Sequence, residues 1–354
     1  MTTSTEPAVD GPRTRRFGTW ASRAGELWIL GILVVLMLFF TVATGGVFLS
    51  SSNLSDMLLN TTSILIIAAS QTIVLIAAGI DLSIGSVIVF CSVAAATMFR
   101  DFSGSAENGY PTLILAVLAS TVVTIVLGIF WGFLNGWLAA RMRIPAFIAT
   151  LGTLGMALGL AQVWTSGLNV TGVPSAIQQG FAQTRFLGVI PWPVLITAFI
   201  VAGLWILLHH TRFGMRTYAL GSNPESLRRA GVNVVRHLII VYTIAGALAG
   251  VVALMEVARF STVSLMSNTQ TNLNAIAAVV IGGTSLFGGY GKMLGTIVGA
   301  FIPAVLRNGF VLMGIQPFWQ TVVLGAVLIL AVFADQVRRG NVPFGSRRHR
   351  ARAA

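Results

Sequence analysis

The sequence TRFGMRTYALGSNPESLRRAGVNVVRH, residues 211–237, separates two strongly apolar segments and is the longest polar interruption in the second half of the chain. It carries five arginines and one acid, Glu225. A short helix is predicted at its centre, because Asn223 suits an N-cap and Pro224 then takes the first helical position, where its missing N–H costs nothing. Gly231 follows this helix, at the position that favours a left-handed backbone.

The charges of this short helix follow its dipole. Glu225 lies in the first turn, where the helix dipole favours an anion, whereas Arg228 and Arg229 lie near the last turn, where it favours cations. One interpretation is a surface that another protein binds. The alternative is an ordinary positively charged cytoplasmic loop, and composition alone does not separate the two.

The composition is that of a polytopic membrane protein. Of the 354 residues, 55% are hydrophobic and 9% are charged, with a mean hydropathy of +0.86, whereas soluble domains carry about 25% charged residues. The net charge of +12 does not indicate nucleic-acid binding, because most Lys and Arg residues gather at one set of ends of the apolar segments. By the positive-inside rule these ends are cytoplasmic. Cys91 is the single cysteine, which excludes a disulfide within the chain.

Ten apolar segments are predicted to cross the membrane as helices, so the expected fold class is all-α with both termini in the cytoplasm. Residues 1–26 then form a basic N-terminal tail, 27–336 the transmembrane domain, and 337–354 a basic C-terminal tail. The third and eighth segments are shorter than the roughly 20 residues of a full crossing, which predicts broken or partly re-entrant helices. The predicted spans are 27–49, 57–79, 83–99, 112–140, 145–166, 191–209, 237–258, 272–287, 291–313 and 318–335.

Glycines recur at a spacing of four residues inside several of these spans. This spacing lets helix backbones approach closely in lipid, where no hydrophobic drive holds helices together. It therefore predicts a tightly packed bundle. The glycines concerned are Gly128, Gly132 and Gly136, Gly155 and Gly159, Gly246 and Gly250, and Gly295 and Gly299.

Polar residues inside the spans are candidates for a translocation pathway, although hydrogen bonds between helices are their commoner use. Asp81 either caps the helix that follows it or takes part in transport. Arg307 either has a buried partner or faces a water-filled cavity, and Glu256 and Arg259, three residues apart, are predicted to pair with each other. The pathway candidates are Gln71, Thr72, Asp81, Ser83, Asn135, Thr150, Thr153, Arg307 and Asn308.

Several kinds of chemistry are missing from the sequence. A phosphate-binding P-loop needs Gly-Lys followed by Ser or Thr, but the only lysine, Lys292, is followed by Met293. No HExxH or GxSxG motif occurs, and no metal-binding or catalytic cluster is expected, so an intramembrane enzyme is poorly supported. An ion-coupled carrier would keep carboxylates in mid-membrane, and Asp81 is the one candidate. The energy for transport is therefore expected to come from another subunit.

Four motifs resemble the membrane permease subunit of bacterial ATP-binding cassette importers, and most of all the branch that takes up ribose, xylose and other simple sugars. The resemblance covers about residues 50–335. It leaves out both basic tails, and Phe287 and Tyr290 make one turn bulkier than is usual in this family. The motifs are GIDLSIGSV (79–87), RIPAFIATLGTLGMALGLA (143–161), ALGSNPESLRRAGVNV (219–234) and AIAAVVIGGTSLFGGYGKMLGTIVGA (275–300).

The resemblance implies a set of partners in the bacterial cytoplasmic membrane. A second permease copy or a paralogue would complete the pathway, two cytoplasmic ATPase subunits would bind ATP and Mg²⁺, and an extracytoplasmic binding protein would deliver the sugar. This chain itself would need no cofactor. By position, the short helix resembles the family's coupling helix, which implies contact with the ATPase for Asn223, Pro224, Glu225, Ser226, Arg228, Arg229 and Gly231.

The expected solute is a monosaccharide or a similar small neutral polyol. An anionic solute would call for several inward-facing cations, and a cationic one for buried carboxylates, but the spans hold mainly uncharged hydrogen-bonding groups. The alternatives are the same machine importing a branched-chain amino acid or a nucleoside, and an ion-coupled secondary carrier that would rely on Asp81.

Overall fold

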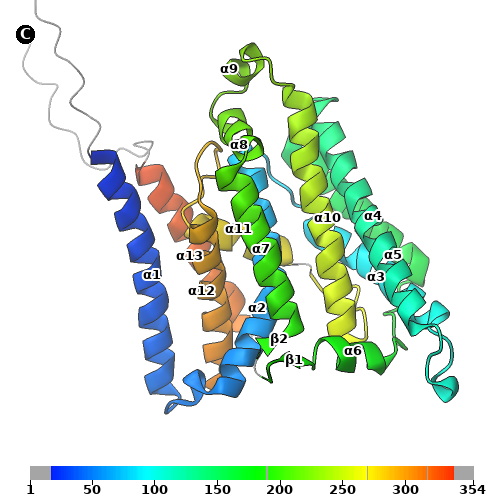
Figure 1. Ribbon diagram of the computed structural model, residues 1–354. Coiled ribbons are helices and arrows are strands. Elements are labelled where there is room, and N and C mark those ends of the chain that lie inside the picture. The colour runs from blue at the N-terminus through cyan, green and yellow to red at the C-terminus, as the bar shows by residue number, and fades with distance from the viewer. Residues whose placement is uncertain (1–16, 189, 269, 317, 339–354) are drawn as a thin grey trace, which may run out of the picture.

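The computed structural model describes residues 17–338 except 189, 269 and 317. Helices dominate this part of the chain. Two antiparallel strands of two residues each, β1 (Arg185–Phe186) and β2 (Ile190–Pro191), pair with each other. Short 3₁₀ turns lie at Val47–Leu49 and Ala106–Asn108. The helices, drawn in Figure 1, are α1 (Phe17–Ala43), α2 (Ser51–Ile76), α3 (Ile84–Phe102), α4 (Leu113–Ala140), α5 (Ala146–Thr165), α6 (Ser175–Phe181), α7 (Trp192–His210), α8 (Arg212–Ser222), α9 (Pro224–Arg229), α10 (Val234–Phe260), α11 (Thr271–Ile281), α12 (Met293–Leu312) and α13 (Phe318–Arg338).

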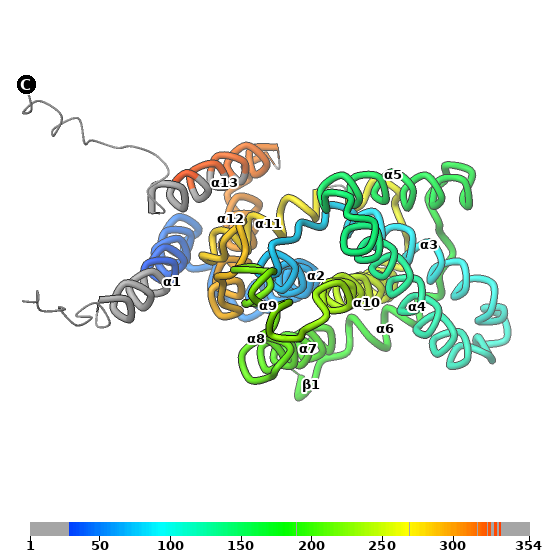
Figure 2. Tube along the Cα trace, turned by 90° about the horizontal axis from the view of Figure 1, so that it is seen from above, coloured from blue at the N-terminus to red at the C-terminus, as the bar shows by residue number. Residues whose placement is uncertain are grey.

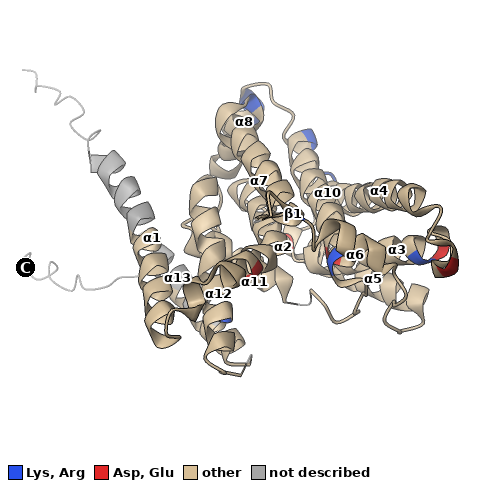
Figure 3. Ribbon diagram, turned by 60° about the horizontal axis from the view of Figure 1, so that its bottom comes forward, with Lys and Arg blue, Asp and Glu red and all other residues tan. Residues whose placement is uncertain are grey.

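The predicted class, an all-α polytopic membrane protein, is confirmed. Among the described residues, seven helices are long and apolar enough to cross a membrane, namely α2, α3, α4, α5, α7, α10 and α12. Two shorter apolar helices, Trp28–Ala43 and Thr271–Ile281, add to these. Figure 3 shows that most of the ribbon between the helix ends carries no charged residue. The total of ten crossings and the cytoplasmic placement of both termini stay predictions.

Helix α2 is the centre of the bundle. Every residue from Ile66 to Ala77 is buried, and α2 contacts α7, α10, α11 and α12. Seen from above, these helices surround it (Figure 2). A helix that is apolar and buried on all sides belongs in the core of a bundle rather than against lipid. By contrast, α4, α5 and α7 each expose much of their apolar surface.

Helices α4 and α10 pack backbone to backbone through the predicted glycines. A Cβ atom added at Gly246 would lie 2.1 Å from the Gly128 carbonyl oxygen, and one at Gly132 would lie 2.3 Å from the Tyr242 carbonyl oxygen. Gly295 and Gly299 of α12 also pack closely against the end of α11, since a Cβ atom at Gly295 would lie 2.0 Å from the Gly282 carbonyl oxygen. For these glycines the predicted close packing is confirmed.

The same prediction is wrong for α5. A Cβ atom at Gly155 or Gly159 would meet nothing within 4 Å. The face of α5 that is buried carries Thr153 and Ala157, and Gly155 lies on an exposed part of the helix. Glycine spacing therefore marks a possible contact face, but only the rotation of the helix decides whether that face meets another helix.

Two crossings begin with buried non-helical backbone and are called the broken crossings; of the short third and eighth segments, only the eighth lacks a helix long enough to cross, because α3 has 19 residues. Residues 77–83 are non-helical and connect the end of α2 to the buried start of α3 at Ile84. Residues 261–268 and 270 are likewise non-helical and precede α11, which has 11 residues. At 1.5 Å per residue, α11 is about half as long as the hydrocarbon core is thick. Non-helical backbone at this depth needs hydrogen-bond partners inside the protein.

Some predicted boundaries are wrong. Helix α1 begins at Phe17 and its apolar part is Trp28–Ala43, so the boundary of the tail at 26 stays a prediction, whereas α2 begins at Ser51 rather than at 57. The Ser50 hydroxyl accepts a hydrogen bond from the backbone N–H of Asn53 (3.4 Å), so a polar cap starts α2 before its apolar run begins. The remaining parts of both predicted tails, 1–16 and 339–354, lie outside the described residues.

Candidate functional site

The non-helical segment 77–83 lies inside the bundle, and side chains from the surrounding helices bind its carbonyl groups. The Ile80 carbonyl accepts from the Tyr242 hydroxyl of α10 and from the Thr150 hydroxyl of α5, each at 3.3 Å. The Asp81 carbonyl accepts from the Gln71 amide of α2 at 2.7 Å. The carbonyl groups of this segment have no helical hydrogen-bond partners. These side-chain hydrogen bonds take their place, so the carbonyl groups are paired although they lie away from water.

Asn272, like Tyr242, is a residue of this network that the sequence did not single out. Its amide nitrogen donates to the Leu82 carbonyl, and its amide oxygen accepts from the Gly85 backbone N–H at 2.7 Å. It therefore joins the first turn of α11 to the first turn of α3. Asn272 is 6% exposed. Its only sequence signal was an amide at the edge of an apolar run, which resembles any polar helix end.

A second chain of polar groups fixes the start of α3. The Asp81 carboxylate accepts from the Ser83 backbone N–H (2.9 Å) and from its hydroxyl (2.6 Å). The Ser83 hydroxyl accepts from the Asn135 amide at 2.7 Å, and the Thr153 hydroxyl donates to the Asn135 amide oxygen at 2.6 Å. All four residues are at most 2% exposed. Asp81 therefore binds Ser83, the residue before α3, and not an N–H group of the first turn of α3, and the group joins α3, α4 and α5.

Thr72 lies in a separate contact. Its hydroxyl is 2.6 Å from the Thr296 hydroxyl, and both side chains are fully buried between α2 and α12. Of the predicted pathway residues, Gln71, Thr72, Asp81, Ser83, Asn135, Thr150 and Thr153 thus make hydrogen bonds within the bundle.

A cavity of about 700 Å³ lies at the end of the bundle away from α9, among the first half of α2, the start of α11, the end of α12 and the start of α13. Its polar lining is mostly uncharged: six amide side chains, two threonines and one arginine, with no carboxylate. Such a lining suits a neutral ligand with many hydroxyl groups. The polar lining residues are Asn60, Asn268, Gln270, Thr271, Asn274, Arg307, Asn308, Gln320 and Thr321.

Arg307 and Asn308 are the predicted pathway residues that line this cavity. Arg307 is exposed, and no carboxylate forms a salt bridge with it among the residues that the structure describes. Of the two interpretations of Arg307, the geometry therefore favours the group that faces a cavity. Asn308 exchanges two amide hydrogen bonds with Asn53 of α2, at 3.0 and 2.9 Å.

The predicted pairing of Glu256 with Arg259 is wrong. Glu256 accepts a hydrogen bond from the Asn268 amide at 2.7 Å, and the Arg259 guanidinium binds the Leu59 carbonyl at 3.1 Å and the Asn60 amide oxygen. Although the two charges are three residues apart on α10, each binds an amide or backbone group of a different segment. Asn60 and Asn268 both line the cavity, so the two charged residues position its wall.

At the other end of the bundle, α9 has the caps that the sequence predicts. The Asn223 side chain accepts from the Ser226 amide at 3.0 Å, Pro224 opens the helix, and Gly231 has a φ of 78°. Glu225 forms salt bridges with Arg228 (3.0 Å) and Arg229 (3.4 Å). These three charged side chains are more than half exposed, so α9 presents a charged surface.

Helix α9 is held on the bundle by its one buried residue, Leu227, and by its connection to α8. The end of α8 contacts the end of α2, because a Cβ atom at Gly221 would lie 1.8 Å from the Ile76 carbonyl oxygen. The Tyr218 hydroxyl donates to the Gly291 carbonyl at 2.7 Å. Burial raises the pKa of Tyr218 to about 12, so the hydroxyl keeps its proton at neutral pH. The end of α8, which is joined to α9, therefore lies against the end of α2, where segment 77–83 begins.

Residues 53–332 match the protein family described as "Branched-chain amino acid transport system / permease component". The chain belongs to this permease family. The resemblance inferred from the four sequence motifs is therefore confirmed, and the match includes both broken crossings, the cavity and α9.

Several curated permeases are similar to this chain over most of their length. The ribose import permease protein RbsC of Escherichia coli K12 is 35% identical over 96% of this chain and 100% of its own. The fructose import permease protein FrcC of Rhizobium meliloti is 34% identical over 86% of this chain and 83% of its own. The xylose transport system permease protein XylH of E. coli K12 is 31% identical over 88% of this chain and 91% of its own. No solved structure matches this permease.

Proposed function

We propose that this permease is the membrane subunit of an ATP-driven importer and forms the path by which a monosaccharide, or a similar small neutral polyol, crosses the bacterial cytoplasmic membrane. The observation that carries the proposal is the full-length similarity to three permeases whose names assign them to ribose, fructose and xylose. Each name gives a neutral monosaccharide, so the shared chemistry is that of a small ring with several hydroxyl groups.

The composition of the cavity supports a neutral solute. Amide and hydroxyl groups donate and accept hydrogen bonds with sugar hydroxyls, and they release the sugar more easily than a buried ion pair would. The ammonium group of an amino acid would find no carboxylate in the lining, and a phosphate would find a single arginine, Arg307. We assign Arg307 and Asn308 to the wall of the path.

The buried network beside segment 77–83 is proposed as the inner boundary of the path. Gln71, Asp81 and Ser83 bind this segment's own backbone or each other, so they would reach a solute only when the segment moves. The end of α8 contacts Ile76, the last residue of α2 before segment 77–83, and this contact gives a route from α9 to the inner boundary. The same assignment includes Thr72, Asn135, Thr150 and Thr153.

A separate subunit is proposed to supply the energy. The sequence contains no P-loop, so ATP and Mg²⁺ would bind to a partner ATPase that contacts α9. A second permease copy or a paralogue and an extracytoplasmic sugar-binding protein complete the proposed assembly. The helix ends that line the cavity lie at the end of the bundle opposite α9, as the ribbon of Figure 1 shows, and this supports the arrangement, because one end would receive sugar and the other would receive the ATPase.

Changing Glu225 to Arg is expected to abolish most uptake while leaving the bundle folded. The substitution replaces both salt bridges of α9 with repulsion and places a cation at the positive end of the helix dipole. Each of these effects is worth at most about 1 kcal/mol on an exposed surface, too little to unfold the protein. The measurement is sugar uptake together with the amount of ATPase that co-purifies with the permease.

Glu107→Arg is the matched control, because Glu107 is an exposed acid in the short 3₁₀ turn after α3, far from α9. It changes the net charge equally and is expected to leave uptake unchanged. If Glu225→Arg keeps both uptake and ATPase association at the level of this control, α9 has no coupling role.

The solute itself is tested by an uptake panel of labelled pentoses, hexoses and polyols, in cells with and without the chain. We expect saturable, chain-dependent uptake of at least one neutral sugar, with no inhibition by excess leucine or phosphate. Uptake that is competed by an amino acid, but by no member of a broad sugar and polyol panel, would overturn the assignment and favour the amino-acid alternative.

A further inference from the structure

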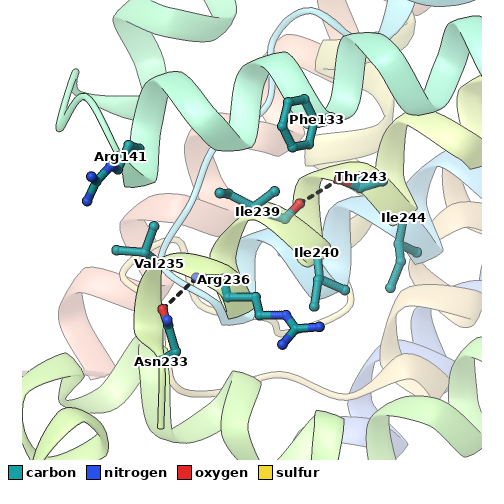
Figure 4. A pocket seen from close by; sticks show the side chains of 9 residues that line it. All are labelled: Phe133, Arg141, Asn233, Val235, Arg236, Ile239, Ile240, Thr243 and Ile244. Atoms are coloured by element: carbon teal, nitrogen blue, oxygen red, sulfur yellow. Dashed lines mark hydrogen bonds between the residues drawn. The ribbon is translucent and has the colours of Figure 1, made fainter.

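A groove of about 590 Å³ lies on the surface between the last turns of α4 and the first turns of α10. The two helices meet at Gly136, where an added Cβ atom would lie 2.7 Å from the Cα atom of Ile239. Beyond this contact α4 ends at Ala140, while Asn233 caps the start of α10. The lining residues, shown in Figure 4, are Phe133, Arg141, Asn233, Val235, Arg236, Ile239, Ile240, Thr243 and Ile244.

The groove has a cationic end and an apolar floor. Arg141 and Arg236 are both exposed and come from the positions where α4 ends and α10 begins. Phe133 and Ile240 lie further along the two helices, 49% and 39% exposed (Figure 4). The Thr243 hydroxyl donates to the Ile239 carbonyl at 2.8 Å, so its donor is used within the helix. The floor therefore offers mainly apolar contact.

The two arginines have no acidic partner within the part of the chain that the structure describes. The salt bridges there join Arg100 to Asp101, and Glu225 to Arg228 and Arg229. Glu225 is the only acid of residues 211–237 and is already paired. Arg141 and Arg236 line one groove from two different helices without a carboxylate, which suits an anion, and guanidinium binds phosphate oxygens with charge-assisted hydrogen bonds.

The position of the groove relative to the membrane selects the kind of anion. Both α4 and α10 are long and apolar enough to cross a membrane, so Phe133 and Ile240 belong to the hydrocarbon region and the arginines to its edge. Basic pockets at this level between membrane helices bind lipid head groups. We propose that the groove binds an anionic phospholipid of the leaflet at the α9 end, with Arg141 and Arg236 on its phosphate and an acyl chain over Phe133 and Ile240.

Charge complementarity favours the lipid over a second copy of this chain. A copy that presented the same face would bring its own two arginines towards these, and like charges repel in a medium of low dielectric. The chain as a whole has 22 basic and 10 acidic residues, so another of its faces is also a poor source of anions. The proposal requires only that α4 and α10 cross a membrane, and it holds whichever solute the permease carries.

The test uses the full chain, purified in a neutral detergent and titrated with phosphatidylglycerol or with phosphatidylcholine. We expect phosphatidylglycerol to raise the melting temperature in a saturable way and phosphatidylcholine to leave it unchanged. The double variant Arg141→Gln/Arg236→Gln is expected to lose the rise. Both residues are exposed, so this variant should fold, which its melting temperature without lipid checks.

The matched control is Arg143→Gln/Arg212→Gln, which removes the same charge from two exposed positions outside the groove. It is expected to keep the response to phosphatidylglycerol. An equal response to phosphatidylcholine, or an equal loss in both double variants, would overturn the proposal. So would a groove variant that changes the oligomeric state on size-exclusion chromatography while its phosphatidylglycerol response stays intact, because the groove would then be an interface between copies.

Discussion

Replacing Gly246 with Ala is expected to remove most of the folded protein. A methyl group at this position would lie 2.1 Å from the Gly128 carbonyl oxygen and 2.7 Å from the Gly132 Cα atom, and neither backbone atom can rotate away as a side chain can. Overpacking of side chains usually costs about 1–3 kcal/mol, and backbone contacts of this kind exceed that range. Because α4 and α10 share the most extensive interface of the bundle, their separation should disturb the whole fold. The measurement is the yield of monodisperse protein and its melting temperature in detergent.

Gly155→Ala on α5 is the matched control. It makes the same chemical change within a membrane helix, but the added methyl group meets nothing within 4 Å. Alanine has a higher helix propensity than glycine by about 1 kcal/mol, so the control should be unchanged or slightly stabilised. If Gly246→Ala melts at the temperature of Gly155→Ala, the close approach of α4 and α10 is wrong.

Replacing Asn272 with Leu is expected to be the most damaging change at a polar position of α11. It leaves two buried backbone groups, the Leu82 carbonyl and the Gly85 N–H, without their partner. An unsatisfied buried group costs about 1–3 kcal/mol, so the total is on the order of 2 kcal/mol or more. The expected result is a lower melting temperature and less folded protein in the membrane.

Asn274→Leu separates stability from transport. Asn274 lies two residues further along α11 and lines the cavity, and residues two apart on a helix do not share a face. We expect a normal melting temperature and reduced sugar uptake per folded molecule. Equal melting temperatures for the two variants would contradict the role of Asn272, and wild-type uptake by Asn274→Leu would remove Asn274 from the pathway.

The parts of the structure that local chemistry decides were predictable. The caps of α9 follow from Asn223, Pro224 and Gly231, whose preferences act within one or two turns and need no distant partner. The short helix of the eighth segment follows from its length compared with the membrane, whereas the same argument fails for the third segment, which forms the 19-residue helix α3. The family resemblance, carried by contiguous motifs, was likewise visible in the sequence and is confirmed by the match over residues 53–332.

Contacts that depend on the rotation of one helix against another were not predictable. Glu256 and Arg259 have the spacing of an ion pair, yet each binds an amide-bearing residue of another segment that packs against α10. Asn272 was missed since an amide beside an apolar run gives no sign that a non-helical segment from the first half of the chain lies against it.

The pathway candidates show the same limit. Arg307 and Asn308 line a cavity, whereas Asp81 and Asn135 are fully engaged in the network around segment 77–83. All four are polar residues within or beside apolar spans, and the sequence treats them alike. What separates them is which side of the bundle core they reach, and this depends on the three-dimensional path of the two broken crossings.

The central claim is that this permease imports a neutral sugar with energy from a separate ATPase. The most direct measurement is chain-dependent uptake of a labelled monosaccharide after cellular ATP is depleted, compared with uptake after an ionophore collapses the ion gradients while ATP is maintained. We predict that ATP depletion abolishes the uptake and that the ionophore leaves it largely intact. Uptake that survives ATP depletion but stops with the ionophore would contradict the account and identify an ion-coupled carrier.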